Sequence, residues 1–213
     1  MIQLLFDQQY LLFILIAFAL IFSLTFHEYG HGKVASLIGD DTAERAGRLT
    51  LNPIPHIDPL GLLMVLVIGI GYAKPVPTDP RKFNTRWGML MVAAAGPGMN
   101  LLLAIVTVNL YLIGQKAGWT LFDSQAAQFF FYYLPLINML LMLFNLLPIG
   151  PLDGSYILPY LLPKDMALKY LQFNQRYGTY ALLALIALHF IGVPVFTTIW
   201  KIGEFMLGIV SFF

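Results

Sequence analysis

The sequence predicts an all-α integral membrane protein, and three observations support that fold class. Of its 213 residues, 59% are hydrophobic and only 11% are charged, whereas a soluble domain has about 25% charged residues. The mean hydropathy is +0.76. Long stretches carry no charged residue at all. A chain of this composition cannot cover itself with polar surface, so the lipid bilayer is its expected surroundings.

The apolar runs predict about five helical membrane segments and one short piece. A spanning helix needs about 20 apolar residues. Three runs reach that length: Tyr10 to Phe26 with a helical pattern continuing to Ile38, Trp87 to Gly114, and Ala126 to Leu147. Leu60 to Ala73 is too short and is predicted to be re-entrant or interfacial. The segments Tyr177 to Ile191 and Val195 to Phe213, separated at Pro194, are predicted to form a C-terminal helical hairpin over 177–213.

The basic residues predict how the chain is oriented. With the N-terminus outside, the predicted cytoplasmic loops carry nine Lys and Arg residues against one, Lys116, in the outside loop. Such an excess marks the cytoplasmic side. The nine are Arg45, Arg48, Lys74, Arg81, Lys82, Arg86, Lys164, Lys169 and Arg176. We therefore expect a multi-pass protein with these loops in the cytoplasm, and the location we expect for it is the cytoplasmic membrane of a prokaryote. No basic run is long enough to indicate nucleic-acid binding.

The string His27-Glu28-Tyr29-Gly30-His31 lies at the predicted inner end of the first helix. Positions i and i+4 share one helix face, so both imidazoles can reach one metal ion. Glu28 follows the first histidine, and its carboxylate can meet a metal-bound water, which is the arrangement of zinc metalloproteases. The chain has no cysteine, so thiolate ligands are excluded. Ionisable residues inside a membrane segment are costly and usually functional.

A catalytic zinc usually has three protein ligands and one open position, so a third ligand must come from elsewhere. Asp153 is the best candidate because it follows the Ala126 span, which in this topology runs from outside to inside. Asp153 and His27 therefore reach a similar depth from the same side. The other interpretation is that Asp153-Gly154 is an ordinary turn.

These two motifs together resemble the site-2 protease family of intramembrane zinc metalloproteases. The matching strings are His27-Glu28-x-x-His31 and Asn145-x-x-Pro148-x-x-x-Leu152-Asp153-Gly154. The segments Asn52 to Gly61 and Ala95 to Asn100 also resemble the family. The resemblance covers roughly residues 10–162, the predicted catalytic core of a single domain over 1–213, and it is to a minimal form without an appended soluble domain.

The resemblance implies cleavage of membrane-spanning substrate proteins. It implies one zinc ion held by His27, His31 and Asp153, with Glu28 as general base and Asn145 near the site. The amide of Asn145 suits an oxyanion hydrogen bond; a helix-end role is the alternative.

The sequence leaves open the roles of His56 and Asp58 and of two strand-like segments. His56 and Asp58 either act beside the metal, as supporting groups or another ligand set, or tie their loop together. The segments Gly47 to Leu51 and Tyr72 to Val76 alternate like strands, which suggests a small β-hairpin that could accept substrate as an added strand. A metal transporter and a scaffold without activity are the rival functions, and the position of Glu28 favours the protease.

Overall fold

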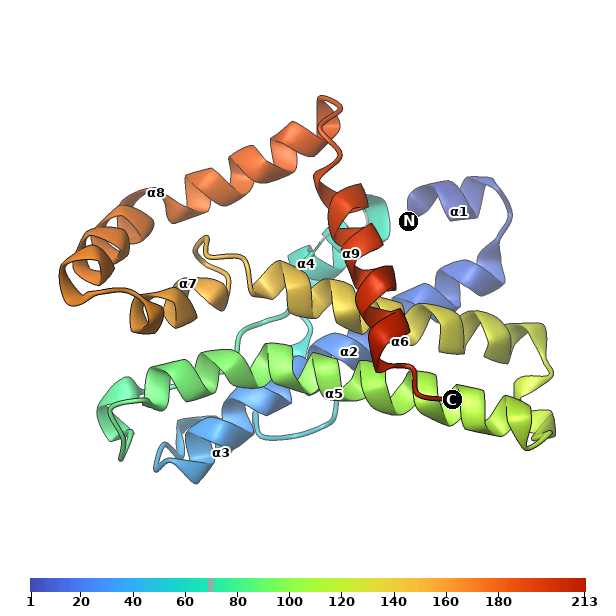
Figure 1. The fold of residues 1–213 in the computed structure, drawn as a ribbon, viewed down its shortest axis with the longest axis horizontal. Helices are drawn as coiled ribbons and strands as arrows, with labels where there is room; N and C mark the ends of the chain where they lie inside the picture. The colour runs from blue at the N-terminus through green and yellow to red at the C-terminus, as the bar shows by residue number, and fades with distance from the viewer. Residues whose placement is uncertain (69–70) are drawn as a thin grey trace.

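The computed structural model describes residues 1–68 and 71–213 (Figure 1). Within those ranges every regular element is helical, which confirms the all-α prediction. The α-helices are α1 (Ile2–Phe6), α2 (Tyr10–Leu37), α3 (Thr42–Arg45), α4 (Pro59–Ile68), α5 (Gly88–Lys116), α6 (Gln125–Asn145), α7 (Gly154–Ile157), α8 (Lys164–Phe190) and α9 (Val195–Val210). Short 3-10 helices are Ile54–His56, Pro80–Lys82, Thr120–Phe122 and Leu158–Leu161.

Three of these helices, α2, α5 and α6, are long and apolar enough to cross a membrane, and a fourth span is possible if α8 and α9 are taken together. Their predominantly apolar sequences form helices because a segment in lipid must satisfy its backbone hydrogen bonds internally. The chain is therefore an integral membrane protein with three to four candidate spans.

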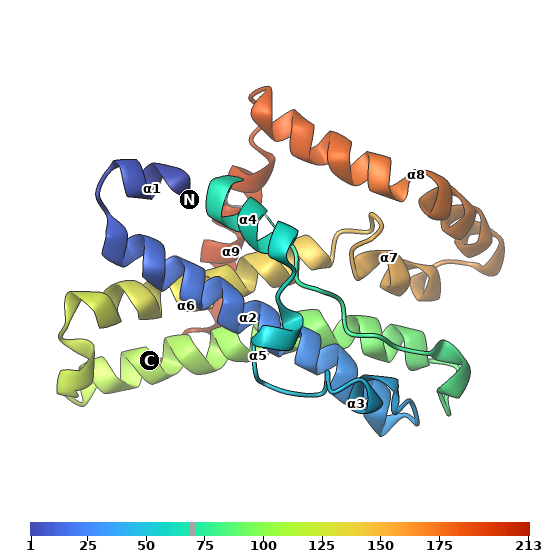
Figure 2. The ribbon, with the colours of Figure 1, turned by 180° about the vertical axis from the view of Figure 1, so that it is seen from behind.

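The helices α2, α5 and α6 lie side by side and form the centre of the molecule (Figures 1 and 2). Ala19 of α2 packs with Leu134 and Ile137 of α6. Close approach of α2 to α5 depends on Gly30, where an added Cβ would lie 2.8 Å from the Ala95 carbonyl oxygen. Small residues at such contacts let membrane helices pack closely. This packing determines which faces of the three helices meet at the functional site.

The C-terminal region differs from the predicted hairpin. Helix α8 begins at Lys164 rather than at Tyr177, and α8 and α9 meet at a bend of 92°, so they form an open corner (Figure 1). The break itself was predicted at the right place. Gly192 there has φ +97, a left-handed conformation that favours glycine, and Pro194 cannot continue a preceding helix.

The predicted β-hairpin is wrong for the residues that the structure describes, because Gly47–Leu51 and Tyr72–Val76 contain no strand. Pro75 and Pro77 have no backbone N–H, so one side of this segment lacks ladder donors. The remaining donors are used elsewhere: the Lys74 N–H binds the His56 carbonyl at 2.8 Å, and the Val76 N–H binds Glu28.

The short apolar piece is present as helix α4, which is 10 residues long. Residues 69 and 70, which belong to the predicted piece Leu60 to Ala73, lie outside the described ranges. Asp58 caps α4 by accepting hydrogen bonds from the backbone N–H groups of Leu60 and Gly61 at 3.0 and 2.9 Å.

Candidate metal centre

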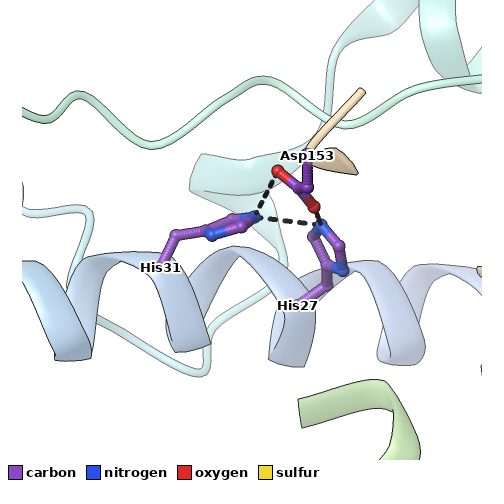
Figure 3. A group of neighbouring side chains, drawn as sticks. All are labelled: His27, His31 and Asp153. Carbon is purple, nitrogen blue, oxygen red and sulfur yellow. Dashed lines mark hydrogen bonds and ion pairs between the residues drawn. The ribbon is translucent and has the colours of Figure 1, made fainter. Parts of the chain in front are cut away.

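Helix α2 brings His27 and His31 onto one face, and Asp153 approaches that face from the loop after α6 (Figure 3). The Nε2 atom of His27 lies 3.2 Å from Asp153 Oδ2, and the Nε2 atom of His31 lies 3.4 Å from Asp153 Oδ1. The two Nε2 atoms are 3.0 Å apart. The three side chains predicted from separate motifs therefore meet, with one potential ligand atom each lying within 4.8 Å of the others.

The loop that carries Asp153 is held in place by its glycines. A Cβ on Gly154 would overlap the carbonyl oxygen of Leu146, so the chain can fold back on the end of α6 only with glycine at this position. The Gly150 N–H donates to Asn174 Oδ1 of α8 at 2.8 Å. These contacts turn the chain after α6 so that the Asp153 carboxylate faces α2.

The charge on Asp153 suits a cation. Burial raises the pKa of the Asp153 carboxyl, but interaction with the protonated imidazoles of His27 and His31 outweighs burial and lowers that pKa to about 2. Asp153 is therefore ionised at neutral pH. Its Oδ2 atom is buried and has no hydrogen bond of acceptable geometry. A buried carboxylate oxygen left in this way requires positive charge beside it.

The hydrogen bonds of the two histidines show which ring nitrogen of each is free to bind a cation beside Asp153. His31 Nδ1 lies 2.7 Å from the Val92 carbonyl oxygen, and His27 Nδ1 lies 2.6 Å from Asn100 Oδ1. Both partners accept, so in the neutral imidazoles each Nδ1 carries the proton and each Nε2 carries a lone pair. Two lone pairs and a carboxylate then converge on one point. Two nitrogens and one carboxylate oxygen form a donor set that zinc accepts.

Glu28 is nearly buried and points toward the extended segment before α5. Its side chain is 9% exposed, and its Oε2 atom accepts a hydrogen bond from the Val76 N–H at 2.8 Å. In the sequence Glu28 follows the candidate metal ligand His27, and the structure adds the Val76 N–H, which binds the Glu28 carboxylate. A carboxylate held by a main-chain donor keeps a defined orientation at little entropic cost.

The remaining candidates are not part of the cluster. The amide of Asn145 donates to the Leu141 carbonyl at 2.9 Å within its own helix, so its oxyanion role stays a prediction. His56 is 2% exposed and its Nε2 lies 2.9 Å from the Thr50 carbonyl oxygen. Together with the capping role of Asp58, this favours the interpretation that these two residues tie their loop together.

Gly96 was expected to allow close helix contact, but the sequence did not show that it lies against the two candidate ligands. It lies on α5 against both imidazoles, and a Cβ added there would lie 2.5 Å from His31 Cε1 and 2.6 Å from His27 Cε1. No real Cβ atom makes contacts this short, so the rings would have to move. Within the string Ala95 to Asn100, Gly96 therefore leaves space for the two imidazoles, and Asn100 is the hydrogen-bond partner of His27.

Replacing Gly96 with alanine is expected to weaken zinc binding about 10–100-fold, the loss typical of changes to residues that orient metal ligands. The matched control is Gly98→Ala on the same helix, where an added Cβ has open space. The measurement is the zinc dissociation constant of each variant by competition with a chelating dye. Equal constants for the two variants would show that the Gly96 contact does not determine the ligand geometry.

Comparison with known proteins agrees with the site. The sequence model of peptidase family M50 matches residues 15–123 and 113–189. YwhC of Bacillus subtilis, whose name describes it as a zinc metalloprotease, is 42% identical over 170 residues, which span 78% of this chain and 77% of YwhC. Two proteins named Rip2, also described as zinc metalloproteases, are 34% identical in Mycolicibacterium smegmatis and 32% identical in Mycobacterium tuberculosis.

Each Rip2 match spans 71% of this chain and 59% of the relative. No solved structure matches the chain. The family match covers more than half of the sequence, including all three residues of the candidate metal centre. The chain therefore belongs to peptidase family M50, the site-2 protease family of zinc metalloproteases.

Proposed function

We propose that this protein hydrolyses peptide bonds of membrane-spanning substrate proteins, with one zinc ion held by His27, His31 and Asp153. The observation that carries the proposal is the convergence of two imidazole lone pairs and an ionised carboxylate, at 3.0–3.4 Å from one another, on long apolar helices. The composition of the chain and the family to which it belongs support a substrate that also lies in the bilayer.

Each side chain has a defined task in this mechanism. The bound zinc would supply a water molecule whose pKa is lowered toward ~7. With zinc bound, Glu28 would take a proton from the attacking water as general base and would later pass it to the leaving amine as general acid. The Val76 N–H keeps the Glu28 carboxylate oriented between those two steps. Asn145 is proposed to reach the developing oxyanion by releasing the Leu141 carbonyl, because an amide donor placed there stabilises negative charge.

The charge distribution supports a site that faces the cytoplasm. The predicted cytoplasmic segments, which include the first half of α8, hold nine basic residues against one outside, and such a bias sets the orientation of membrane proteins. The histidines lie toward the end of α2 that leads into the basic segment before α5. We propose that the protein lies in the cytoplasmic membrane of a prokaryote and that water reaches the site from the cytoplasmic side.

The test is hydrolysis in a reconstituted bilayer. The purified protein, stripped of metal and then reloaded with zinc, is incubated in liposomes with a library of single-span proteins of varied spanning sequence. We expect cleavage only in the zinc-loaded sample, at bonds in or beside the spanning segment, as mapped by mass spectrometry. Cleavage restricted to a water-soluble unfolded protein, or no cleavage by the zinc-loaded protein, would contradict the proposal.

A further inference from the structure

Three fully buried polar side chains lie at the centre of the bundle, one on each of α2, α5 and α6. Ser23 of α2, Asn100 of α5 and Asn138 of α6 are each 0% exposed. Buried amides are costly in apolar surroundings unless their hydrogen bonds are satisfied. The mechanism above uses none of the three, so their presence at this depth needs a reason.

The hydrogen bonds of these residues form one connected network that ends at His27. Asn138 Nδ2 donates to Ser23 Oγ and to the Leu134 carbonyl, both at 2.9 Å. Asn138 Oδ1 accepts from Asn100 Nδ2 at 2.8 Å. Asn100 Nδ2 also lies 3.3 Å from the Ser23 carbonyl oxygen. The remaining polar atom, Asn100 Oδ1, faces His27 Nδ1 at 2.6 Å.

The direction of every bond in this network is fixed at its far end. The Ser23 hydroxyl donates to the Ala19 carbonyl at 2.6 Å, so its oxygen is left to accept from Asn138. The carbonyl of Leu134 can only accept, which places the NH₂ group of Asn138 on that side. Asn138 then presents its oxygen to Asn100, and Asn100 presents its oxygen to His27. Because the Ala19 and Leu134 carbonyls can only accept hydrogen bonds, the donor and acceptor roles along the network cannot be exchanged. His27 must therefore carry its proton on Nδ1.

The two histidines differ in this respect. His31 Nδ1 faces a main-chain carbonyl, that of Val92, at 2.7 Å, a partner that no side-chain substitution removes. The tautomer of His27 depends instead on the amide of Asn100, 73 residues away in sequence. A metal-binding histidine usually donates its other ring N–H to such a partner, which orients the ring and raises its basicity.

We propose that Asn100 and, through it, Asn138 are positioning residues that hold His27 in the tautomer and ring orientation in which Nε2 is free to bind the metal. The inference rests on the proposed metal site and adds to it the residues that prepare one ligand. Neither amide touches the reacting atoms. Their effect is on zinc affinity, and it reaches peptide hydrolysis only through the metal.

The test compares zinc dissociation constants of purified variants by competition with a chelating dye. Asn100→Leu, which removes the acceptor for His27, is expected to weaken zinc binding about 10–100-fold. Asn100→Asp keeps an acceptor for His27 but places its second oxygen against Asn138 Oδ1 and the Ser23 carbonyl. It is therefore expected to recover only part of the affinity that Asn100→Leu loses. Asn138→Leu acts through Asn100 and is expected to have a smaller effect, about 3–10-fold.

Asn109 supplies the matched control on the same helix. It is also buried, at 8% exposed, and its amide binds the Ile105 and Val210 carbonyls, each at 2.8 Å, and the Phe212 N–H. Asn109→Leu therefore removes a satisfied buried amide without touching His27. It is expected to lower thermal stability and leave the zinc dissociation constant unchanged.

The outcomes separate this inference from the proposed function. Wild-type affinity in Asn100→Leu, equal weakening in Asn109→Leu, or no restoration in Asn100→Asp would each overturn the positioning role. If Asn100→Leu does not fold, the ratio of the Asn138→Leu and Asn109→Leu constants decides, and equal constants overturn the role. A wild-type protein that binds no zinc overturns both. A protein that binds zinc in the expected order of variants but cleaves nothing refutes only the proposed function.

Discussion

Replacing Glu28 with glutamine is expected to lower peptide hydrolysis by about 10²–10⁴-fold, the range that a general base contributes, while the zinc content stays near that of the wild type. Glutamine has the size of glutamate and can still accept the hydrogen bond that the Val76 N–H now donates to the Glu28 carboxylate at 2.8 Å. It cannot take a proton from water near neutral pH. The substitution therefore removes the proposed chemistry and keeps the local structure.

The measurement is the rate of substrate cleavage in liposomes together with zinc per chain. Glu44→Gln is the matched control, because Glu44 lies exposed on α3 and has no place in the mechanism. Full activity in Glu28→Gln would exclude Glu28 as the base. Loss of zinc in the same variant would instead make Glu28 a ligand. A metal transporter, the rival function, would not require the proton chemistry of this residue.

The residues of the cluster that could be predicted are those that helical spacing or the topology of the spans brings together. His27 and His31 share a face because any α-helix places i and i+4 together. Asp153 could be placed at their depth because the topology of the spans determines which loop ends lie on the same side. The three-residue convergence in Figure 3 needed no knowledge of how the helices pack.

The residues that escaped prediction depend on the rotation of one helix against another. Asn100 reaches His27, and Gly96 makes room for both imidazoles, only because one face of α5 is turned toward α2. A polar residue in an uncharged span was the available signal for Asn100, but nothing in the sequence named its partner. The β-hairpin failed for another reason. That prediction rested on the alternation of side chains, and it ignored that Pro75 and Pro77 have no backbone N–H to donate to a neighbouring strand.

Removing the Asp153 carboxylate is expected to release most of the zinc. A wild-type protein with about one zinc per chain has three protein ligands for it, and Asp153→Ala leaves only the two imidazoles. The loss is larger than that of one neutral ligand, because Asp153 is the anionic member of the set and carboxylates are ionised at neutral pH. Elemental analysis of the detergent-purified proteins measures the change.

Asp58→Ala is the control that gives this result its meaning. Asp58 was the other carboxylate open to a metal-binding interpretation, and in the structure it caps α4 through the Leu60 and Gly61 N–H groups. Its loss should loosen that helix end and leave zinc in place. If zinc persists in Asp153→Ala but is lost in Asp58→Ala, the metal site lies in the loop before α4 and not at Asp153. If zinc is lost only in Asp153→Ala, the loop after α6 positions the one negatively charged ligand of the metal. Neither histidine can supply negative charge, because each binds the metal as a neutral ring.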